Sequence, residues 1–336
     1  MSFSGKHGPL LIAEIGGNHE GDFLYANDLL DLALDSQADA IKFQIYFPDT
    51  LVNKSESPDR WEHFKKFTFS PMQHIELAEK CKAGGKEYLA SVWDIDALDW
   101  IDPYLSYYKI GSGDLTAYPI LEKVVEKGKP IILSTGLSTF SEVEESVRFI
   151  QGLDHRYEDR NMLAVLQCSS MYPIPEVEAN LNVIGTLGRE LNISVGYSDH
   201  TEDMEALYLA AVVGADVLEF HFTDTKQGKT FRDHKVSLTK DDVSQLVGRI
   251  RRAHEIFGSG VKEPTASELE NKHPISFRRA IYPVRDIIKG EVMRDVDLTA
   301  LRPNRGVDAR YTYRIIGKRA KKNIGLLDVL DEDMFE

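Results

Sequence analysis

The chain has 336 residues, with 54 acidic and 40 basic side chains, and therefore a formal net charge of −14 at pH 7. This negative charge disfavours non-specific binding to nucleic acid or an anionic membrane, because both are polyanions. No stretch approaches the roughly 20 apolar residues of a membrane span. The two cysteines have no CxxC spacing, which argues against a disulfide framework or a zinc cluster. The N-terminus lacks the pattern of a signal peptide, so we expect a cytoplasmic protein.

Short apolar runs alternate with amphipathic helical patterns along most of the chain. The expected strands are 10–15, 40–45, 87–92, 107–111, 130–134, 163–167, 193–197 and 217–222. The expected helices are 25–36, 72–83, 95–101, 119–127, 142–150, 183–190, 203–213 and 240–257. Such alternation is typical of a parallel sheet buried on both faces, and the number of units matches a (β/α)₈ TIM barrel. The alternative fold is a doubly wound open sheet, but in this chain no glycine-rich dinucleotide turn follows the first run.

The chain after the barrel changes in composition and charge. Residues 258–276 are polar and irregular, which predicts a linker between a barrel domain at 1–257 and a small domain at 277–336. Short alternating stretches at 280–284, 287–290, 315–316 and 323–327 indicate that the small domain is β-rich. Residues 277–322 carry a net charge of +8, whereas the last 14 residues carry −5. An acidic barrel is therefore joined to a basic segment.

Polar side chains gather where the expected strands end. In a TIM barrel the chemistry lies at this edge and in the loops that follow it. The groups at these positions are Glu14, Asn18, Lys42, Gln44, Lys109, Ser112, Asp114, Ser134, Ser170, Tyr172, Ser198, His200, Glu219, His221 and Asp233. Unpaired charges are expensive to bury, so strands that served only packing would not carry these lysines and glutamates. The pattern predicts an enzyme, and polar plugs in the barrel interior are the alternative.

Two inward lysines among hydroxyl groups indicate a pocket for phosphate or carboxylate. For Lys42 or Lys109 alone, an ion pair with a glutamate is an equal alternative. His200 and His221 end neighbouring strands and suit a first-row divalent metal completed by a carboxylate, water or substrate oxygen, whereas His200 alone could equally be a core or capping residue. For Asp233, a general acid or second-layer support competes with a simple loop cap. Cys168 lies within an apolar run and is expected to be a buried, inert thiol.

Eight segments of the barrel and three of the small domain together carry a family resemblance. The barrel segments are AEIGGNHEGD (13–22), IKFQIY (41–46), YKIGSGD (108–114), ILSTG (132–136), QCSSMYP (167–173), GYSDHT (196–201), LEFHFT (218–223) and RDHKVSL (232–238). The later segments are RRAIYPVRDIIKGEV (278–292), ALRPNRGV (300–307) and IIGKRAKKNIGLLDVL (315–330). In this order the barrel segments resemble the sialic acid synthase family, which includes N-acetylneuraminate and spore-coat polysaccharide synthases. The later segments resemble its antifreeze-like (SAF) domain.

The resemblance implies a condensation of phosphoenolpyruvate with the open-chain aldehyde of an N-acylated hexosamine, with release of inorganic phosphate. It implies that His200 and His221 hold a divalent metal, Mn²⁺ or Mg²⁺, and that a domain-swapped homodimer brings Arg302 to the partner's barrel. The expected catalytic groups are Glu14, Asp114 and Asp233. The expected substrate-binding groups are Asn18, Lys42, Gln44, Lys109, Ser112, Ser134, Ser170, Tyr172, Ser198 and Arg302.

The chain departs from the family pattern near the acceptor side of the site. Asp114 replaces the usual Glu, Ser170 replaces an Asn, and Phe231-Arg232 replaces a Gly-Pro or similar pair. Ala117 stands where Asn is common, Phe220 lies between Glu219 and His221 where Lys is common, and the tail motif is RPNRG rather than RPGxG. Phosphoenolpyruvate use is therefore a firmer expectation than any named sugar. A Schiff-base aldolase or lyase acting on pyruvate, with Lys42 or Lys109 as nucleophile, and a non-catalytic sugar-binding protein are the alternatives.

Overall fold

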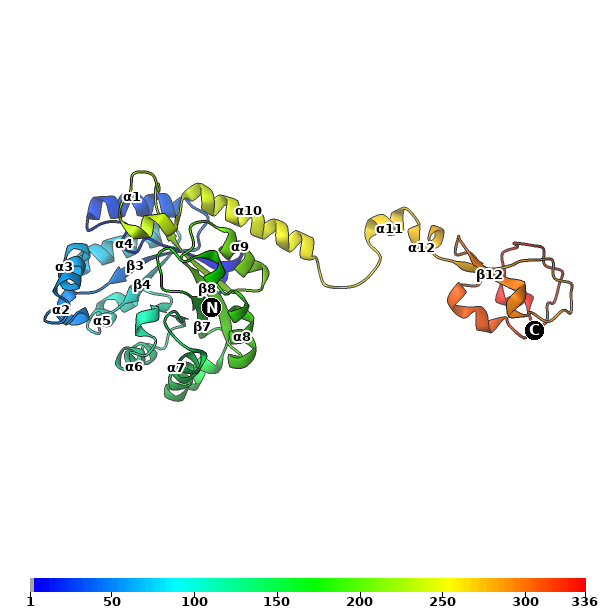
Figure 1. Ribbon diagram of the computed structural model, residues 1–336, viewed down its shortest axis with the longest axis horizontal. Helices are drawn as coiled ribbons and strands as arrows, with labels where there is room; N and C mark the ends of the chain where they lie inside the picture. Colours follow the sequence, from blue (N-terminus) through cyan, green and yellow to red (C-terminus); the bar gives the residue numbers. More distant parts are fainter. Residues whose placement is uncertain (1–2) are drawn as a thin grey trace. The chain divides into compact units, whose positions relative to one another are not determined.

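The computed structural model describes residues 3–336, and the chain forms two compact units, one ending at Phe257 and the other comprising Gly258–Glu336. The first unit is a closed barrel of eight parallel strands surrounded by helices (Figure 1). The strands are β2 (Gly8–Glu14), β3 (Ala40–Ile45), β4 (Glu87–Val92), β5 (Tyr108–Ile110), β6 (Ile131–Ser134), β7 (Leu163–Cys168), β8 (Ser194–Asp199) and β9 (Val217–Phe222). Each pairs with the next, and β9 pairs with β2 to close the barrel. The predicted TIM barrel is confirmed.

The helices of the barrel unit lie outside the strands, and all of them except α2 bury side chains. They are α1 (Phe23–Leu34), α2 (Pro48–Leu51), α3 (Pro58–Phe67), α4 (Pro71–Ala83), α5 (Ala97–Ile101), α6 (Tyr118–Glu126), α7 (Phe140–Leu153), α8 (Asn182–Leu191), α9 (Glu205–Val212) and α10 (Lys240–Phe257). Helices α4 and α7 begin at capping boxes, Ser70 with Gln73 and Thr139 with Glu142, which satisfy the free amides of the first turn. No helix of residues 3–336 is both long and apolar enough to cross a membrane.

The inside of the barrel has an apolar end and a polar end. A buried cluster that includes Phe3, Leu10, Ile12, Leu89 and Ile132 fills the end where the strands start. Two residues further along β2 the inward side chain is Glu14, which pairs in register with Lys42 of β3 on one side and with His221 of β9 on the other. Because side chains alternate along a strand, Ile12 and Glu14 lie on the same face of β2. The inward side chains therefore change from apolar to charged between these two positions.

The second unit contains a small antiparallel sheet of β11 (Ala280–Pro283) and β12 (Leu298–Leu301). A buried cluster forms its own core, including Ile281, Ile287, Met293, Ile324 and Leu330. The sheet is the kind expected for an antifreeze-like domain. Residues 258–276, predicted as a linker, contain the short helices α11 (Ala266–Glu270) and α12 (His273–Ser276) and group with this unit. Residues 315–316, one of the alternating stretches that indicate β structure, follow the 3₁₀ helix η7 (Ala309–Arg314) and belong to no strand.

Candidate active site

A first polar group lies around Lys42, deep in the carboxyl-terminal end of the barrel. Lys42 Nζ lies 2.5 Å from Glu14 Oε2 and donates to Ser91 Oγ at 3.1 Å. Gln44 Nε2 donates to Glu14 Oε1 at 2.7 Å, so both oxygens of this carboxyl have a cationic or amide neighbour. The lysine and the glutamate are each only 2% exposed. Burial of this kind requires pairing, which the contacts supply.

A second polar group lies around Lys109, which the structure brings to the same barrel interior. Lys109 Nζ donates to Ser134 Oγ at 2.7 Å and lies 3.7 Å from Glu219 Oε1. Ser198 Oγ donates to the same glutamate oxygen at 3.2 Å. Glu219 Oε2 has no hydrogen-bond partner among residues 3–336. The predicted lysine and serine positions therefore converge, and they leave an unsatisfied buried carboxylate oxygen.

The two buried carboxyls differ in their pKa directions. Burial raises the pKa of Glu14, and the nearby Glu219 adds to this rise while Lys42 opposes it. Burial also disfavours the charged form of Glu219, but Lys109 and Lys42 outweigh it and lower its pKa. Two carboxyls whose pKa values move apart are candidates for separate acid and base roles. Glu219 stays ionised, while Glu14 is the group able to exchange a proton.

The two predicted metal ligands lie together under an aromatic ring. The ring centroids of His200 and His221 are 5.4 Å apart, and the ring of Tyr172 lies 4.0 Å from His200 and 5.6 Å from His221. His200 Nδ1 is 2.7 Å from the carbonyl oxygen of Ser169. A proton on that nitrogen leaves Nε2 with a free lone pair, the arrangement that second-layer carbonyls impose on metal-ligating histidines.

The donor set fits a divalent metal that keeps open positions for other ligands. His221 Nδ1 is buried without a hydrogen-bond partner within residues 3–336 and lies 3.9 Å from Asp233 Oδ2. Burial lowers the pKa of His221 to about 4, so the imidazole is neutral at pH 7. No group of three or more His, Cys, Asp or Glu side chains in the described chain forms a complete metal site. The protein therefore offers two imidazoles, with water or substrate oxygens needed to complete coordination.

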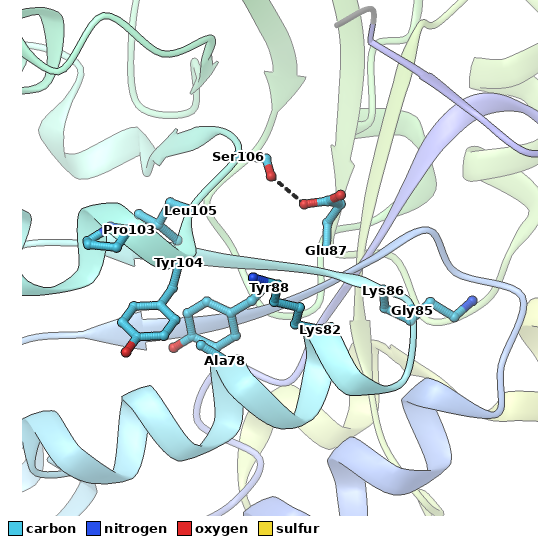
Figure 2. Close-up of a pocket in the computed structure, with 10 residues that line it drawn as sticks. All are labelled: Ala78, Lys82, Gly85, Lys86, Glu87, Tyr88, Pro103, Tyr104, Leu105 and Ser106. Atoms are coloured by element: carbon cyan, nitrogen blue, oxygen red, sulfur yellow. Dashed lines mark hydrogen bonds between the residues drawn. The ribbon is translucent and has the colours of Figure 1, made fainter.

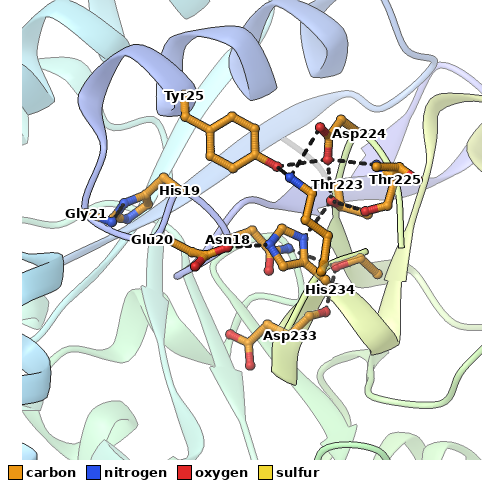
Figure 3. A network of polar contacts seen from close by, with 12 residues as sticks. Asn18, His19, Glu20, Gly21, Tyr25, Thr223, Asp224, Thr225, Asp233 and His234 are labelled. Atoms are coloured by element: carbon orange, nitrogen blue, oxygen red, sulfur yellow. Dashed lines mark hydrogen bonds and ion pairs between the residues drawn. The ribbon is translucent and has the colours of Figure 1, made fainter. Parts of the chain in front are cut away.

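Asp233 lies on the 3₁₀ helix η5 (Arg232–Val236), which hydrogen bonds connect to the loop after β2 and to β9. Ser237 Oγ donates to the Asp233 carbonyl at 2.7 Å, and Asn18 Nδ2 donates to Ser237 Oγ and to the Phe222 carbonyl, both at 2.9 Å. The Asp233 carboxyl points away from this network in Figure 3. Asn18 is fully buried, so its amide nitrogen supports the segment that carries Asp233, while its Oδ1 has no partner among the described residues.

A polar network fixes the loop between β9 and η5. His234 Nδ1 is 2.7 Å from Thr223 Oγ1, which donates to Asp224 Oδ1 at 3.0 Å (Figure 3). Tyr25 OH donates to the same Asp224 oxygen at 2.8 Å and accepts from Lys229 Nζ at 2.5 Å. These bonds join α1 to the loop after β9, so the position of Asp233 depends on side chains at both ends of the barrel sequence.

The loops after β5, β6 and β7 meet at Gly136. Gly136 N donates to Ser112 Oγ at 3.0 Å, and a Cβ on Gly136 would lie 2.8 Å from that oxygen and 2.4 Å from Ser170 Oγ. The two predicted substrate-binding hydroxyls therefore converge only because residue 136 has no side chain. Ser170 and Cys168 also line a hollow of about 650 Å³. Asp114 follows β5, and burial raises its pKa to about 6 although Lys109 opposes the rise.

Cys168 is buried, as predicted, and the structure adds a contact that the sequence did not indicate. Its Sγ lies 3.9 Å from His200 Nδ1. Burial raises the pKa of the thiol, but the contact with His200 outweighs burial and leaves the pKa below its ordinary value. The thiol therefore belongs to the surroundings of His200.

Arg302 lies in the second unit, where its guanidinium carbon is 5.5 Å from the centroid of the Phe277 ring. Its contact with a partner's barrel stays a prediction.

A separate hollow of about 350 Å³ lies at the starting end of β4, beside Glu87, Tyr88, Tyr104 and Ser106 (Figure 2). It contains none of the residues predicted for the site.

Sequence reasoning missed several residues that support the site. Ser91 binds Lys42, and its signal is its position on β4 opposite Gln44 and Lys109 in the strand register. Tyr25 and Lys229 hold the β9 loop, and no sequence signal connects two residues 204 positions apart. Pairing of this kind follows from barrel closure and is visible only in the structure.

A closed barrel whose carboxyl-terminal end buries two lysines, two glutamates and two histidines defines a TIM-barrel enzyme. The model of the NeuB family matches residues 29–262 of the chain. The chain belongs to this family, and it is an enzyme of the sugar-acid synthase type.

Similar proteins extend this likeness over nearly the whole chain. The N,N'-diacetyllegionaminic acid synthase of Legionella pneumophila is 34% identical over 327 residues, which cover 94% of this chain and 91% of that protein. The synthase of the same name from Campylobacter jejuni is 32% identical and covers 94% and 96%. The solved structure of the N-acetylneuraminic acid synthetase from Leptospira borgpetersenii is 30% identical, with a TM-score of 0.71, over 79% of this chain and 90% of that one.

Proposed function

We propose that this enzyme joins the three-carbon unit of phosphoenolpyruvate to the aldehyde of an open-chain N-acylated hexosamine, forming a nonulosonic acid and releasing inorganic phosphate. N-acetylmannosamine is the reference acceptor. The observation that carries the proposal is the convergence of Lys42, Lys109, Ser134 and Ser198 beside His200 and His221 at one end of the barrel. Family membership supports the same class of reaction.

The lysine side of the site receives phosphoenolpyruvate. Lys42 and Lys109 attract its carboxylate and phosphate, and the hydroxyls of Ser134 and Ser198 donate hydrogen bonds to the same oxygens. Ser112 and Ser170, which converge at Gly136, extend this set of donors. Lys42 and Lys109 are already paired with Glu14 and Glu219, so their geometry is fixed before the ligand enters.

The other side of the site receives the acceptor sugar. Gln44, Tyr172 and Asp233 contact it there, with its aldehyde toward His200 and His221. A divalent metal, Mn²⁺ or Mg²⁺, when bound at these two histidines supplies Lewis-acid polarisation of the aldehyde oxygen. The Ser169 carbonyl beside Nδ1 of His200, which leaves Nε2 available, and the unpartnered Nδ1 of His221 support this assignment.

Asp233 and Glu14 then transfer protons during the two bond-forming steps. Carbon 3 of phosphoenolpyruvate attacks the aldehyde carbon, and Asp233 protonates the oxygen that becomes a hydroxyl. Water adds to the cationic carbon 2 and gives its proton to Glu14, whose pKa is raised by burial. The tetrahedral intermediate loses inorganic phosphate by cleavage of the bond between carbon 2 and the phosphate oxygen, the hydroxyl on carbon 2 gives its proton to the departing phosphate, and the keto group remains. Asp114, whose pKa is raised to about 6, is the further group able to exchange a proton here.

The small domain completes the site from a second copy of the chain. In this part of the proposal a domain-swapped homodimer brings Arg302 to the acceptor sugar in the partner's barrel. The basic charge of residues 277–322 and the acidic charge of the barrel sequence support such docking, because opposite charges attract across an interface.

The decisive experiment is a phosphate-release screen. The protein is mixed with phosphoenolpyruvate, Mn²⁺ and one aldose from a panel that includes N-acetylmannosamine, with a reaction lacking the aldose as the control. We expect aldose-dependent phosphate release and a product whose mass equals that of the aldose plus the pyruvyl unit. If no aldose of the panel released phosphate, the proposal would be refuted.

One observation favours a second candidate, a Schiff-base lyase. Burial lowers the pKa of Lys109, with Lys42 adding to the effect and Glu219 opposing it. A lysine of lowered pKa is the nucleophile that such enzymes use. Borohydride reduction with pyruvate would add a pyruvyl mass to Lys109 in that case, whereas the synthase proposal expects no covalent adduct.

A further inference from the structure

Positive side chains gather on one part of the barrel rim, outside the groups discussed so far. We define the cationic rim as Arg60 and Lys66 of α3 together with Arg232 of η5, arranged around His63. Lys66 Nζ lies 5.3 Å from the centroid of the Phe67 ring, and the ring of His63 lies 4.6 Å from that of Phe67. Burial lowers the pKa of His63, Arg232, Lys66 and Arg60 add to the effect, and Asp233 opposes it. Two segments far apart in sequence thus build one positive surface.

Arg232 is the member of the cationic rim that reaches the active site. Its guanidinium carbon lies 4.7 Å from the centroid of the Tyr172 ring, and the centroid of that ring lies 4.0 Å from that of His200. Its Nε donates to Asp233 Oδ1 at 3.2 Å. The side chain is 68% exposed, and its two terminal nitrogens have no partner within residues 3–336. The free edge of the guanidinium is the edge that binds anions in a bidentate manner.

The backbone beneath Arg232 is held by packing. The ring of the preceding residue, Phe231, lies 5.1 Å from that of Phe67 and 6.3 Å from that of His63. A Cβ on Gly17 would lie 2.9 Å from the Phe231 ring, so this ring rests directly on the loop after β2. Asp233, on the other side of Arg232, is buried. The arginine is therefore presented at the mouth by two fixed neighbours.

The charges of the site indicate which molecule Arg232 meets. Lys42 and Lys109, on the phosphoenolpyruvate side, have glutamate partners of their own. Arg232 lies instead against Tyr172 and Asp233, the side assigned above to the acceptor sugar. The two terminal nitrogens of Arg232 stay available there, because Asp233 contacts it through Nε alone. An anion on the acceptor would use the remaining donors.

We propose that Arg232 binds an anionic group, a phosphate monoester or a carboxylate, carried by the acceptor sugar at the end remote from its aldehyde. This assignment rests on the proposed function and narrows its substrate class to charged hexosamine derivatives. Arg60 and Lys66 add long-range attraction from the same rim.

The test compares three acceptors with phosphoenolpyruvate and Mn²⁺: N-acetylmannosamine, its 6-phosphate and its 6-carboxylate, the uronic acid. The proteins are the wild type, Arg232→Ala, Arg232→Lys and the control Lys235→Ala. Lys235 lies on the same 3₁₀ helix, and its side chain is 58% exposed. Product is quantified by mass spectrometry, and kcat/KM is measured for each acceptor and KM for phosphoenolpyruvate.

We expect wild-type kcat/KM to be higher for one of the charged acceptors than for the neutral sugar, and this preference identifies the anion. In Arg232→Ala the preference falls about 10-fold or more, which is the usual loss for a charge-assisted hydrogen bond. Arg232→Lys keeps part of it, and Lys235→Ala keeps all of it. A preference unchanged in Arg232→Ala, an equal loss for all three acceptors, or a change only in KM for phosphoenolpyruvate would overturn the proposal.

Failure of the proposed function is distinguishable from failure of this inference. If the wild type turned over none of the three acceptors, the synthase reaction would be in doubt, and calorimetry would then test Arg232 alone. Weaker binding of the 6-phosphate or the 6-carboxylate by Arg232→Ala than by the wild type would support the inference. Equal binding by both proteins, or no binding of either sugar by the wild type, would refute it.

Discussion

Lys42 Nζ lies 2.5 Å from Glu14 Oε2, and both side chains are almost completely buried at the polar end of the barrel. They stand on neighbouring strands in direct register. A buried pair of this kind is seldom a net gain in stability over an apolar pair, but removing one partner leaves a costly buried charge. The pair is therefore best understood as a fixed piece of the reaction site, and it makes a sharp prediction.

Lys42→Met should destabilise the barrel by about 3–5 kcal/mol, because Glu14 is then buried without its cation. The double variant Lys42→Met/Glu14→Gln should recover at least half of that loss, yet remain inactive. Urea unfolding followed by tryptophan fluorescence measures this, since all three tryptophans, Trp61, Trp93 and Trp100, lie in the barrel unit. The exposed Lys82→Met is the control. A double variant as unstable as the single one would contradict the pairing argument.

His200→Ala should lower kcat at least about 100-fold, because the loss of a metal ligand is expected to exceed the 10- to 100-fold cost of losing a supporting partner. The circular dichroism spectrum and melting temperature should stay close to those of the wild type. His155→Ala is the matched control, since that imidazole is 86% exposed. Full activity in His200→Ala would refute the metal assignment.

Gly136→Ala should raise KM for phosphoenolpyruvate about 10-fold or more, because the new Cβ would lie 2.4 Å from Ser170 Oγ and displace it. Gly152→Ala is the control within the next helix, where a Cβ would meet nothing within 4 Å. That control should keep wild-type kinetics and gain about 0.5–1 kcal/mol from higher helix propensity. The measurement is KM for phosphoenolpyruvate from steady-state kinetics of both variants. Equal KM values for Gly136→Ala and Gly152→Ala would show that the hydroxyl pair of Ser112 and Ser170 does not bind the substrate.

Asp114 should make the stability of the wild type depend on pH in a defined window. Burial raises the pKa of its carboxyl from the ordinary value of 3.8 to about 6, so the folded state favours the protonated form. Its stabilising contribution is present below pH 3.8 and is lost as the pH rises to 6. The difference in unfolding free energy between wild type and Asp114→Asn should therefore change by about 2 kcal/mol across this window, a value reduced for partial exposure. A difference in unfolding free energy between wild type and Asp114→Asn that stays constant with pH would contradict the raised pKa of Asp114.

Arg302→Ala and His200→Ala should complement each other if the small domain acts on a partner's barrel. Each variant alone is expected to lose activity. After mixing and exchange of subunits, a mixed dimer would contain one intact barrel facing one intact Arg302, and activity would return in part. Phosphate release before and after exchange measures this. Two inactive variants that stay inactive when mixed, although mass spectrometry detects the mixed dimer, would show that Arg302 acts within its own chain.

The barrel could be predicted closely because its strands are continuous apolar runs. The predicted strands 40–45, 87–92 and 217–222 coincide with β3, β4 and β9, and the predicted helix 240–257 coincides with α10. A strand buried on both faces needs apolar residues at nearly every position, so the ends of the apolar run mark the ends of the strand. The count of such runs then determined the fold class.

Helix α3 could not be predicted, because only Trp61 and Phe67 of its ten residues are buried. Two buried positions six residues apart give no stripe at the helical period of about 3.6. In the small domain, β12 was missed because none of its residues is buried and no alternation marks it. The alternating stretch at 315–316 does not form a strand, because an apolar side chain such as Ile315 can also enter a core from a 3₁₀ turn.

The positions of the site residues could be predicted, but their pairing could not. Barrel geometry brings every strand end to one edge, so Lys42, Lys109 and the two histidines were expected together. The choice of Glu14 for Lys42 and Glu219 for Lys109 depends on strand register and side-chain direction. The contact of Cys168 with His200 depends on the same details.

The closure of β9 onto β2 also determines when the site can come into existence during synthesis. Glu14 pairs in register with His221, and Asn18 binds the carbonyl of Phe222, 204 residues later in the chain. The growing polypeptide therefore emerges from the ribosome with its first strand edge unpaired until the ninth strand follows. An exposed edge of this kind is prone to wrong pairing. β1 (Ser4–Gly5) pairs only with Gly8 and Pro9, whereas β9 pairs with Leu10–Glu14, so nascent chains shorter than about 220 residues should be the stage most dependent on chaperones.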